Sequence, residues 1–232
     1  MPRKIYKLFI SYDEAGAELR KHMVEQDQCS NNRVWEASFR GLTVEDLPPG
    51  DGVIWVYPVF MQSGVTVTVT LPELLRTLYA ENGQYPELVF KPVWGACFND
   101  IVFRVVPTLQ KELKGAVSLL VVAHGVTEMV LAPEPVQFLK HLETLLPEGT
   151  DMALAYFGAS PSVEDVLPKL KWQKVIVLPF LIGKGKHMLE DMPTPELASR
   201  YGKTLKILPP FGVFYLQMER ENMKAGLGDV GV

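Results

Sequence analysis

The sequence contains an internal repeat with a period of about half its length. The segment TVEDLPPGDGVIWVYP, which begins at Thr43, resembles SVEDVLPKLKWQKVIVLP, which begins at Ser162. In both copies the final proline stands six residues before a glycine, and that glycine stands eight residues before another proline. Further along, KPVWG resembles LPPFG, with Gly95 matching Gly212. So long a period indicates a duplicated domain rather than a solenoid. We expect two lobes, 1–114 and 115–232, which meet near Lys114-Gly115.

Apolar runs alternate with amphipathic segments in both halves. Predicted strands lie at 5–10, 33–39, 53–57, 88–93, 117–123, 152–157, 175–178 and 205–208. Predicted helices lie at 13–26, 72–79, 95–113, 133–146, 195–200 and 214–223, with capped helical turns that start at Thr43 and Ser162. This alternation predicts an α/β fold with parallel sheets and helices on both faces. Because proline cannot donate to a ladder, we expect Pro58 and Pro179 to end their strands and Pro107 to kink or end its helix.

Charge and composition exclude several classes of function. The net charge is −4, which does not favour binding to nucleic acid. The apolar run near the N-terminus is too short for a secretory signal peptide, and no window is long and apolar enough to span a membrane. The two cysteines, Cys29 and Cys97, stand far apart without metal-ligand spacing, which is typical of reduced thiols in a cytosolic protein. We expect a cytoplasmic protein.

Two histidines follow buried strands of the second half. His124 comes directly after the run 117–123, and His187 follows the run 175–178 and a glycine-rich turn. Neighbouring strands of an open parallel sheet end at one edge, where such folds bind ligands. Imidazole binds borderline divalent metals and is a base near neutral pH. Two histidines leave most coordination positions open, which suits a metal that is handed on.

The repeat provides an internal comparison for this pair. In the first half Thr66 occupies the place of His187, and Thr70 that of Asp191. The copies share prolines and glycines but differ in polar chemistry, as expected for one working site and one degenerate copy. The alternative is that both copies drifted and His187 is incidental. The other histidines, His22 and His141, fall within amphipathic helices and are not expected in a site.

The segments LLVVAHG and VIVLPFLIGKGKHMLEDMP resemble the paired signatures of the class II tetrapyrrole chelatases, which include the sirohydrochlorin cobaltochelatases and ferrochelatases. The match covers 117–219 directly. The resemblance implies two similar flavodoxin-like lobes facing a central cleft, in which a divalent metal enters a macrocycle without ATP. It also implies that His124 and His187 present the metal and accept protons. The metal is then a substrate, and no cofactor is permanently bound.

Further residues near these signatures have two interpretations each. Glu190 and Asp191 can orient the His187 ring or pass protons outward, whereas Asp191 can instead cap the next helix. Glu128 can recruit a cation or be a solvated loop acid. Lys184 and Lys186 can pair with the carboxylate arms of the macrocycle or lie on the surface.

The sequence departs from the family at one place. Many members carry a glutamate before the SVED segment as a third metal-site residue, whereas this chain reads AYFGASP at 155–161. Either the third ligand is dispensable, or Tyr156, Glu128 or Glu190 replaces it, or the activity has shifted. Tyr156 is also a candidate substrate contact.

Together, these features predict a metal chelatase of the lyase class. We expect it to insert Co²⁺ or Fe²⁺ into sirohydrochlorin for cobalamin or sirohaem synthesis. The alternatives are a chelatase for Ni²⁺ or for another tetrapyrrole, a non-catalytic tetrapyrrole or metal carrier, and a flavodoxin-like regulatory domain. Because a duplicated chain supplies both lobes, a monomer would suffice, and a homodimer is also possible.

Overall fold

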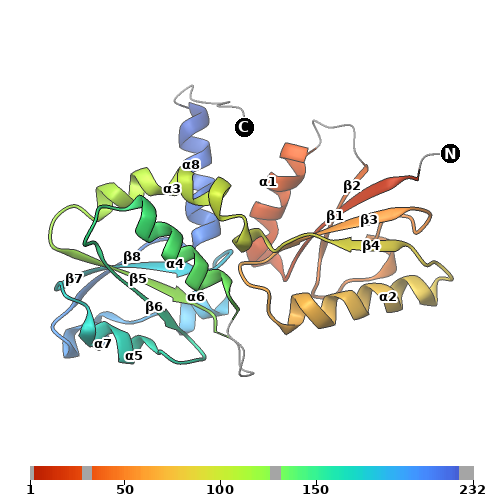
Figure 1. The fold of residues 1–232 in the computed structure, drawn as a ribbon. Coiled ribbons are helices and arrows are strands. Elements are labelled where there is room, and N and C mark those ends of the chain that lie inside the picture. The colour runs from red at the N-terminus through yellow and green to blue at the C-terminus, as the bar shows by residue number, and fades with distance from the viewer. Residues whose placement is uncertain (1–2, 28–32, 126–131, 225–232) are drawn as a thin grey trace. The chain divides into compact units, whose positions relative to one another are not determined.

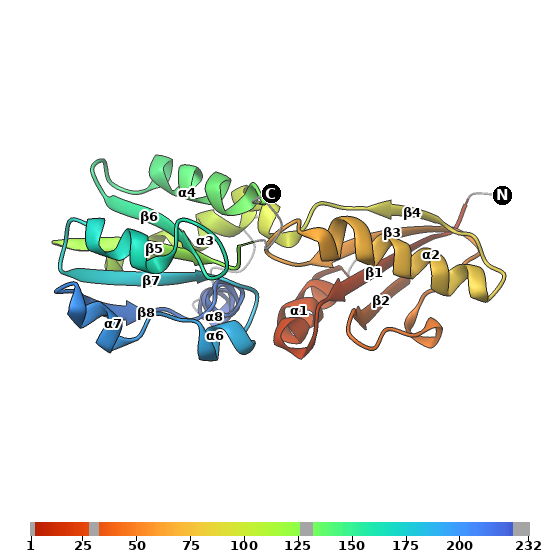
Figure 2. The same cartoon turned by 90° about the horizontal axis from the view of Figure 1, so that it is seen from below.

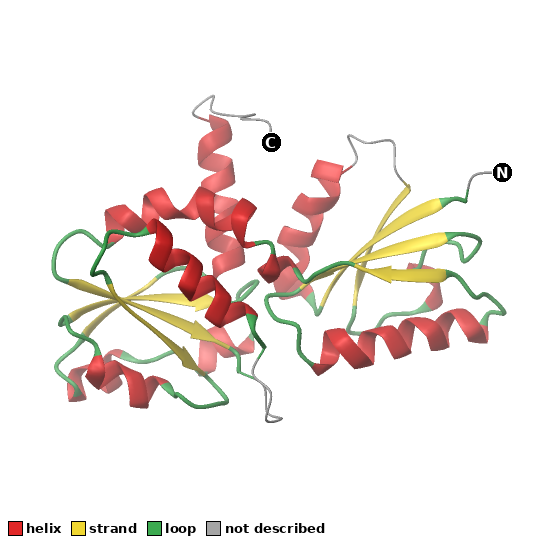
Figure 3. Ribbon diagram, in the orientation of Figure 1, coloured by secondary structure: helices red, strands yellow, loops and turns green. Residues whose placement is uncertain are grey.

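The computed structural model describes residues 3–27, 33–125 and 132–224, and the remaining residues are drawn in grey in Figure 1. Glu128 and Cys29 lie outside the described residues. The chain divides into two compact units, 1–96 and 97–232. Helices cover both faces of the sheet in each unit (Figure 3). The predicted α/β class is therefore confirmed.

The N-terminal unit contains a parallel sheet of four strands in the order β2-β1-β3-β4, which Figure 2 shows side by side. The strands are β1 (Ile5–Ser11), β2 (Arg33–Ser38), β3 (Val53–Val59) and β4 (Glu87–Phe90). Helix α1 (Ala17–Asp27) and helix α2 (Leu71–Glu81) cover opposite faces (Figure 1). Short 3₁₀ turns lie at Glu14–Gly16, Val44–Asp46 and Trp94–Ala96, and a π-helix at Thr66–Thr70 leads into α2.

The C-terminal unit repeats this sheet, with the order β6-β5-β7-β8. Its strands are β5 (Val117–Ala123), β6 (Asp151–Tyr156), β7 (Lys174–Phe180) and β8 (Thr204–Ile207). Its helices are α3 (Phe98–Glu112), α4 (Glu134–Leu145), α5 (Val163–Val166), which runs into a 3₁₀ turn at Leu167–Lys169, α6 (Lys186–Glu190), α7 (Pro195–Arg200) and α8 (Phe211–Lys224). The two lobes are therefore similar, as the repeat predicts.

Helix α3 packs within the C-terminal unit. The Thr108 hydroxyl donates to the Met218 sulfur at 3.1 Å, and Gln110 donates to the Leu145 carbonyl at 3.2 Å. An ion pair joins Glu112 to Lys206 at 2.5 Å. The compact units thus divide before α3, whereas the boundary of the duplication near Lys114-Gly115 stays a prediction about the origin of the chain.

Equivalent helix starts in the two lobes use the same capping chemistry. In the first lobe the Thr43 backbone and hydroxyl both lie 2.9 Å from the Asp46 carboxylate. In the second lobe the Ser162 backbone donates to Asp165 at 2.9 Å, and the Asp165 backbone donates to the Ser162 hydroxyl at 3.2 Å. These are the capping boxes expected from the SVED and TVED segments.

The predicted strand-ending role of the two prolines is wrong. Pro58 lies within β3 opposite Ile10, and Pro179 lies within β7 opposite Val122. The outer strands β4 and β8 pair only as far as Val56 and Val177. Residues two apart in a strand direct their backbone groups to the same side. The nitrogens of Pro58 and Pro179 therefore face the side where β4 and β8 have already ended, so no ladder bond is lost. Pro107 likewise does not end its helix, because α3 continues to Glu112.

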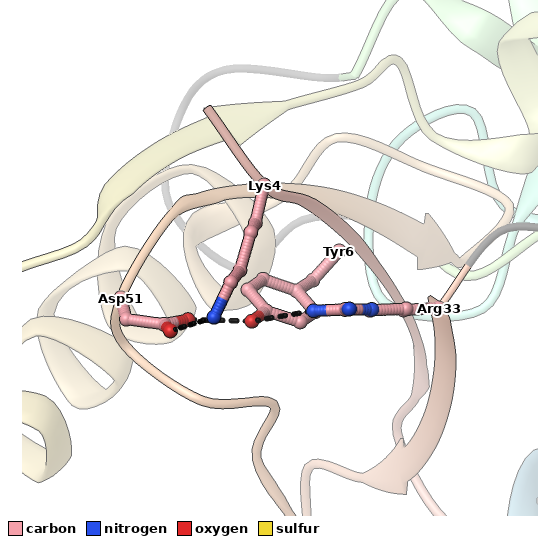
Figure 4. Close-up of polar contacts among 4 residues, drawn as sticks. All are labelled: Lys4, Tyr6, Arg33 and Asp51. Carbon is pink, nitrogen blue, oxygen red and sulfur yellow. Dashed lines mark hydrogen bonds and ion pairs between the residues drawn. The ribbon is translucent and has the colours of Figure 1, made fainter. Parts of the chain in front are cut away.

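The amino ends of the first-lobe strands are joined by a polar cluster (Figure 4). Asp51 accepts hydrogen bonds from the Lys4 ammonium and from the Tyr6 hydroxyl, both at 2.5 Å. The Arg33 guanidinium donates to the same hydroxyl at 3.3 Å. Because the cluster lies at the end opposite to the carboxyl edge, we assign it a structural role.

Candidate functional site

Strands β5 and β7 lie side by side in the second sheet and run parallel. Their register pairs Val117 with Lys174 and Ala123 with Phe180. All seven residues of β5 are buried, as are six of the seven in β7. The segments that carry His124 and His187 therefore leave the sheet at the same edge, as expected from the sequence.

An aromatic cluster supports this edge from the α4 side. The ring centroid of Phe138 in α4 lies 4.9 Å from that of Phe180, the last residue of β7, and 5.0 Å from that of Phe211, the first residue of α8. All three side chains are buried. The strand end that precedes His187 is thus anchored by packing rather than by solvent-exposed contacts.

His124 follows β5 directly, and its exposed ring makes a local hydrogen bond. Its Nδ1 lies 2.7 Å from the carbonyl oxygen of Gly125. Because a carbonyl can only accept, Nδ1 carries the hydrogen of the neutral ring, and Nε2 carries the lone pair that can bind a metal or accept a proton.

The conformation of Gly125 explains the His-Gly pair. Its φ is +71°, which favours glycine, and a Cβ at this position would lie 3.1 Å from the Cβ of Ala159. A larger residue would press against the loop after β6 and displace the carbonyl that holds the His124 ring.

His187 lies in the first turn of α6, where the Met188 backbone donates to the Gly185 carbonyl at 3.0 Å. Its side chain lies outside the described part of the structure. The first lobe has the same backbone bond, from Val67 to the Gly64 carbonyl at 2.9 Å. The two copies therefore share the frame, and Thr66 takes the place of His187.

The charged residues around α6 are exposed. Lys186 and Glu190 form an ion pair at 3.5 Å along the helix, and Lys184 lies in the preceding turn. Asp191 follows α6 at once. The cap of α7 is Thr194, whose hydroxyl accepts from the Leu197 backbone at 3.2 Å. The capping role considered for Asp191 is therefore wrong.

Tyr156 ends β6 and pairs in register with Ala123. Its side chain is 2% exposed, and its hydroxyl has no hydrogen-bond partner among the described residues. Burial raises the pKa of the Tyr156 hydroxyl, which therefore stays neutral. This residue sits at the expected edge of the sheet, but its side chain is enclosed within the lobe.

Glu134 was not singled out from the sequence. It is the first residue of α4 and only 4% exposed, and its Oε2 has no partner among the described residues. It stands one turn before Phe138, so both side chains lie on the face of α4 that packs on the sheet. An acid in the first turn of a helix is commonplace, and the sequence carries no signal of its burial.

Where the chain is described, no three His, Cys, Asp or Glu side chains gather as they would around a metal ion. No helix in that part is long and apolar enough to cross a membrane. The two-histidine arrangement and the central cleft stay predictions.

The chain is similar to one family model and to several solved structures. Residues 118–217 match the CbiX family model. A CbiX structure described as the terminal enzyme of sirohaem biosynthesis in denitrifying bacteria is 21% identical, with a TM-score of 0.56 over 97% of this chain and 100% of that one. SirB from Bacillus subtilis with Fe³⁺ is 13% identical, with a TM-score of 0.60 over 96% of this chain and 98% of that one.

A multi-domain protein from Deinococcus radiodurans, DR2241, described as structurally similar to chelatases, is 15% identical. Its TM-score is 0.61 over 95% of this chain, which spans 55% of that protein. No curated protein matches the sequence. The structural likenesses show a shared two-lobed fold, and the family match falls on the lobe that carries both signatures. The chain is therefore similar to the CbiX family over residues 118–217 of its C-terminal lobe, the part that carries the two signatures resembling the class II tetrapyrrole chelatases.

Proposed function

We propose that this protein inserts Co²⁺ or Fe²⁺ into sirohydrochlorin without ATP, in cobalamin or sirohaem synthesis. The observation that carries the proposal is the CbiX match over residues 118–217, which contains His124 at the end of β5 and His187 at the start of α6. The fold shared with SirB, which has been solved with Fe³⁺ and with cobalt, supports it.

His124 is suited to two successive tasks. Insertion of a divalent metal expels two pyrrole N–H protons, and a base must accept them. The Nε2 lone pair of His124 first holds the metal. Once the metal passes to the macrocycle, the same lone pair takes a proton. His187 has the same role and accepts the second pyrrole proton.

Protons then need a path away from the rings. Glu190 and Asp191 lie at the end of α6 close to His187 in sequence and are exposed, which suits transfer to solvent. Lys184 and Lys186 on the same segment supply positive charge for substrate carboxylates. Glu134, buried at the start of α4, is the acid of the described lobe that we propose in place of the missing family glutamate.

A non-catalytic metal or tetrapyrrole carrier is the second candidate. The absence of an acid at 155–161 favours it. A carrier binds its ligand stoichiometrically and tightly without turnover. Insertion of Ni²⁺, or use of another tetrapyrrole, would instead preserve the chemistry and change its specificity.

The test follows the absorbance of sirohydrochlorin under anaerobic conditions with Co²⁺, Fe²⁺ or Ni²⁺. We expect a spectral shift faster than the uncatalysed reaction, with multiple turnovers. His124→Ala and His187→Ala should each abolish the acceleration, and His141→Ala, in the middle of α4, should not. A wild-type rate equal to the uncatalysed one would refute the enzyme, and a spectral change that stops at one equivalent would identify a carrier.

A further inference from the structure

Three aromatic residues stand in a row at the carboxyl edge of the first sheet. Tyr12 directly follows β1, Phe39 follows β2 and Phe60 follows β3, and these strands are neighbours in the order β2-β1-β3. The ladders of β1 with both neighbours end one residue earlier, so the three residues occupy equivalent positions. Open parallel sheets bind their ligands at this edge. We call Tyr12, Phe39 and Phe60 the aromatic row.

The rings of the aromatic row contact one another. The ring centroid of Tyr12 lies 5.7 Å from that of Phe39 in a stacked arrangement, and 6.5 Å from that of Phe60 in an edge-to-face arrangement. Aromatic pairs prefer these two geometries. Tyr12 is nevertheless 43% exposed, and neither Phe39 nor Phe60 is fully buried. Packing therefore fixes the rings but leaves aromatic surface open to a ligand.

Arg40 adds a positive charge to the aromatic row. Its guanidinium carbon lies 5.6 Å from the centroid of the Tyr12 ring, and the residue is exposed. Within the described ranges, Arg40 forms no ion pair. The acid next to Tyr12 in the sequence, Asp13, caps a 3₁₀ turn by accepting from the Ala15 backbone at 3.0 Å. The guanidinium beside the row is therefore available to an anionic group.

Equivalent backbone bonds show that the aromatic row occupies the place of the candidate site in the second lobe. The Arg40 backbone donates to the Tyr12 carbonyl at 2.9 Å, as the Gly158 backbone donates to the His124 carbonyl at 3.3 Å. Tyr12 thus stands where the second lobe has His124, and Arg40 stands where it has Gly158. The edge that carries the candidate metal-binding histidine in one lobe carries aromatic rings and a cation in the other.

We propose that the first lobe holds the macrocycle of the substrate through the aromatic row and Arg40. The rings contact the conjugated macrocycle, and the guanidinium pairs with one of its carboxylate arms. This inference rests on the proposed function, to which it adds the substrate-binding residues of the lobe that lacks the histidines. A tetrapyrrole is a conjugated ring edged with carboxylates, so an aromatic surface beside a guanidinium matches both of its features. A metal ion does not suit the row, because Arg40 would repel it.

Binding of metal-free sirohydrochlorin, followed anaerobically by its fluorescence, tests the aromatic row without catalysis. The variants are Tyr12→Leu, Tyr12→Phe and Arg40→Gln. We expect Tyr12→Leu to bind about three- to tenfold more weakly because it loses the ring, and Tyr12→Phe to stay within about twofold of wild type. Arg40→Gln should bind about two- to fivefold more weakly, and its deficit should shrink as salt is added.

The chain offers matched controls at the amino ends of its strands. Tyr85→Leu replaces a tyrosine that is 81% exposed and precedes β4. Arg200→Gln replaces an exposed arginine at the end of α7, whose guanidinium carbon lies 6.0 Å from the centroid of the Tyr201 ring. Both variants should bind as tightly as wild type. Circular dichroism and urea unfolding show whether each variant is folded.

The outcomes decide between a binding surface and simple packing. Weaker binding in both Tyr12→Leu and Arg40→Gln, with unchanged binding in the two controls, supports the proposal. Affinities of Tyr12→Leu and Arg40→Gln equal to those of the controls overturn it, as does a wild type that does not bind the metal-free macrocycle. A loss in Tyr12→Phe as large as in Tyr12→Leu overturns the ring contact. If Tyr12→Leu does not fold, Arg40→Gln, which changes an exposed side chain, decides the outcome.

Steady-state metal insertion separates this inference from the proposed function. If insertion proceeds, Tyr12→Leu and Arg40→Gln should raise KM for the macrocycle and change kcat little, as expected for groups that bind the ground state and the transition state alike. Insertion with an unchanged KM in both variants overturns the aromatic row alone. Binding that depends on Tyr12 and Arg40, in a wild type that inserts no metal, supports the row and refutes the chelatase.

Discussion

Gly212 lies so close to Ile182 that a Cβ on Gly212 would stand 2.2 Å from the Ile182 carbonyl oxygen. The Gly212 backbone also donates to the Leu181 carbonyl at 3.1 Å, which ties the start of α8 to the segment that leads to His187. The first lobe has the same arrangement: a Cβ on Gly95 would stand 2.0 Å from the Met61 carbonyl oxygen. Gly95 and Gly212, which match in the repeat, therefore have the same role: each leaves room for a backbone carbonyl that a side chain would displace.

Gly212→Ala is expected to damage both stability and activity. The new methyl must push the Leu181-Ile182 backbone aside, which costs about 1–3 kcal/mol by analogy with overpacked cores. That backbone positions α6, so metal insertion should fall as well. Urea unfolding and the anaerobic insertion assay measure the two effects. Gly95→Ala should reduce stability similarly.

Gly64→Ala is the matched control for these glycine variants, because nothing lies within 4 Å of a Cβ built at Gly64. Its stability should stay within about 0.5 kcal/mol of wild type, as for most surface substitutions. Wild-type stability in Gly212→Ala would contradict the close approach.

The stability contributed by the Lys4–Asp51 pair should depend on pH in a defined window. Hydrogen bonds from Lys4 and Tyr6 hold the pKa of the Asp51 carboxyl below its usual 3.8, and the bond to Asp51 raises the pKa of Lys4 above 10.5. The lowered acid pKa stabilises the fold above 3.8, and this contribution is lost as pH falls through the folded-state value. The raised lysine pKa stabilises the fold below 10.5, and this contribution is lost as pH rises beyond it.

Denaturant titrations of wild type and Asp51→Asn between about pH 2 and pH 8 test this window, because that range brackets the usual carboxyl pKa of 3.8. The two proteins should differ most near neutral pH and converge in acid. A difference that stays constant into strong acid would show that the Asp51 charge is not responsible.

Ser162→Ala should weaken the start of α5. The hydroxyl caps the Asp165 backbone at 3.2 Å, and loss of such a cap typically costs about 1 kcal/mol. Thr43→Ala should have a similar effect in the first lobe. Ser199→Ala, whose hydroxyl bonds a carbonyl within α7, is the comparison and should be nearly neutral. Equal unfolding midpoints for Ser162→Ala and Ser199→Ala would argue against the capping box.

Much of this fold can be predicted from local signals. Apolar runs predict the strands, the SVED and TVED segments predict the caps, and the spacing of prolines and glycines predicts the similarity of the lobes. The position of Pro58 inside β3 cannot be predicted from the neighbouring residues, because β3 accepts a proline there only since β4 pairs no further than Val56. The grouping of α3 with the second unit likewise depends on contacts with α8 that lie about half a chain away.

The candidate site was predictable only in part, for a related reason. The position of His124 directly after β5 follows from the sequence, because the buried apolar run that precedes it ends there. Its role in a site stays a prediction. Glu134 did not stand out, because its distinguishing property is burial, and burial is a consequence of packing against the sheet.

Glu134→Gln is expected to slow metal insertion without destabilising the lobe. An amide keeps the shape of the side chain but cannot accept a proton. If the Glu134 carboxylate receives protons from the histidines, the insertion rate at saturating metal should fall by about tenfold or more, as for other acid–base groups. Stability should stay level, because the amide fills the same buried position and leaves one polar atom there without a partner, as the carboxylate does. Glu143→Gln, on the exposed face of the same helix, is the control. If Glu134→Gln turns over as fast as Glu143→Gln, then Glu134 belongs to the packing of α4 and the missing family acid has no substitute there.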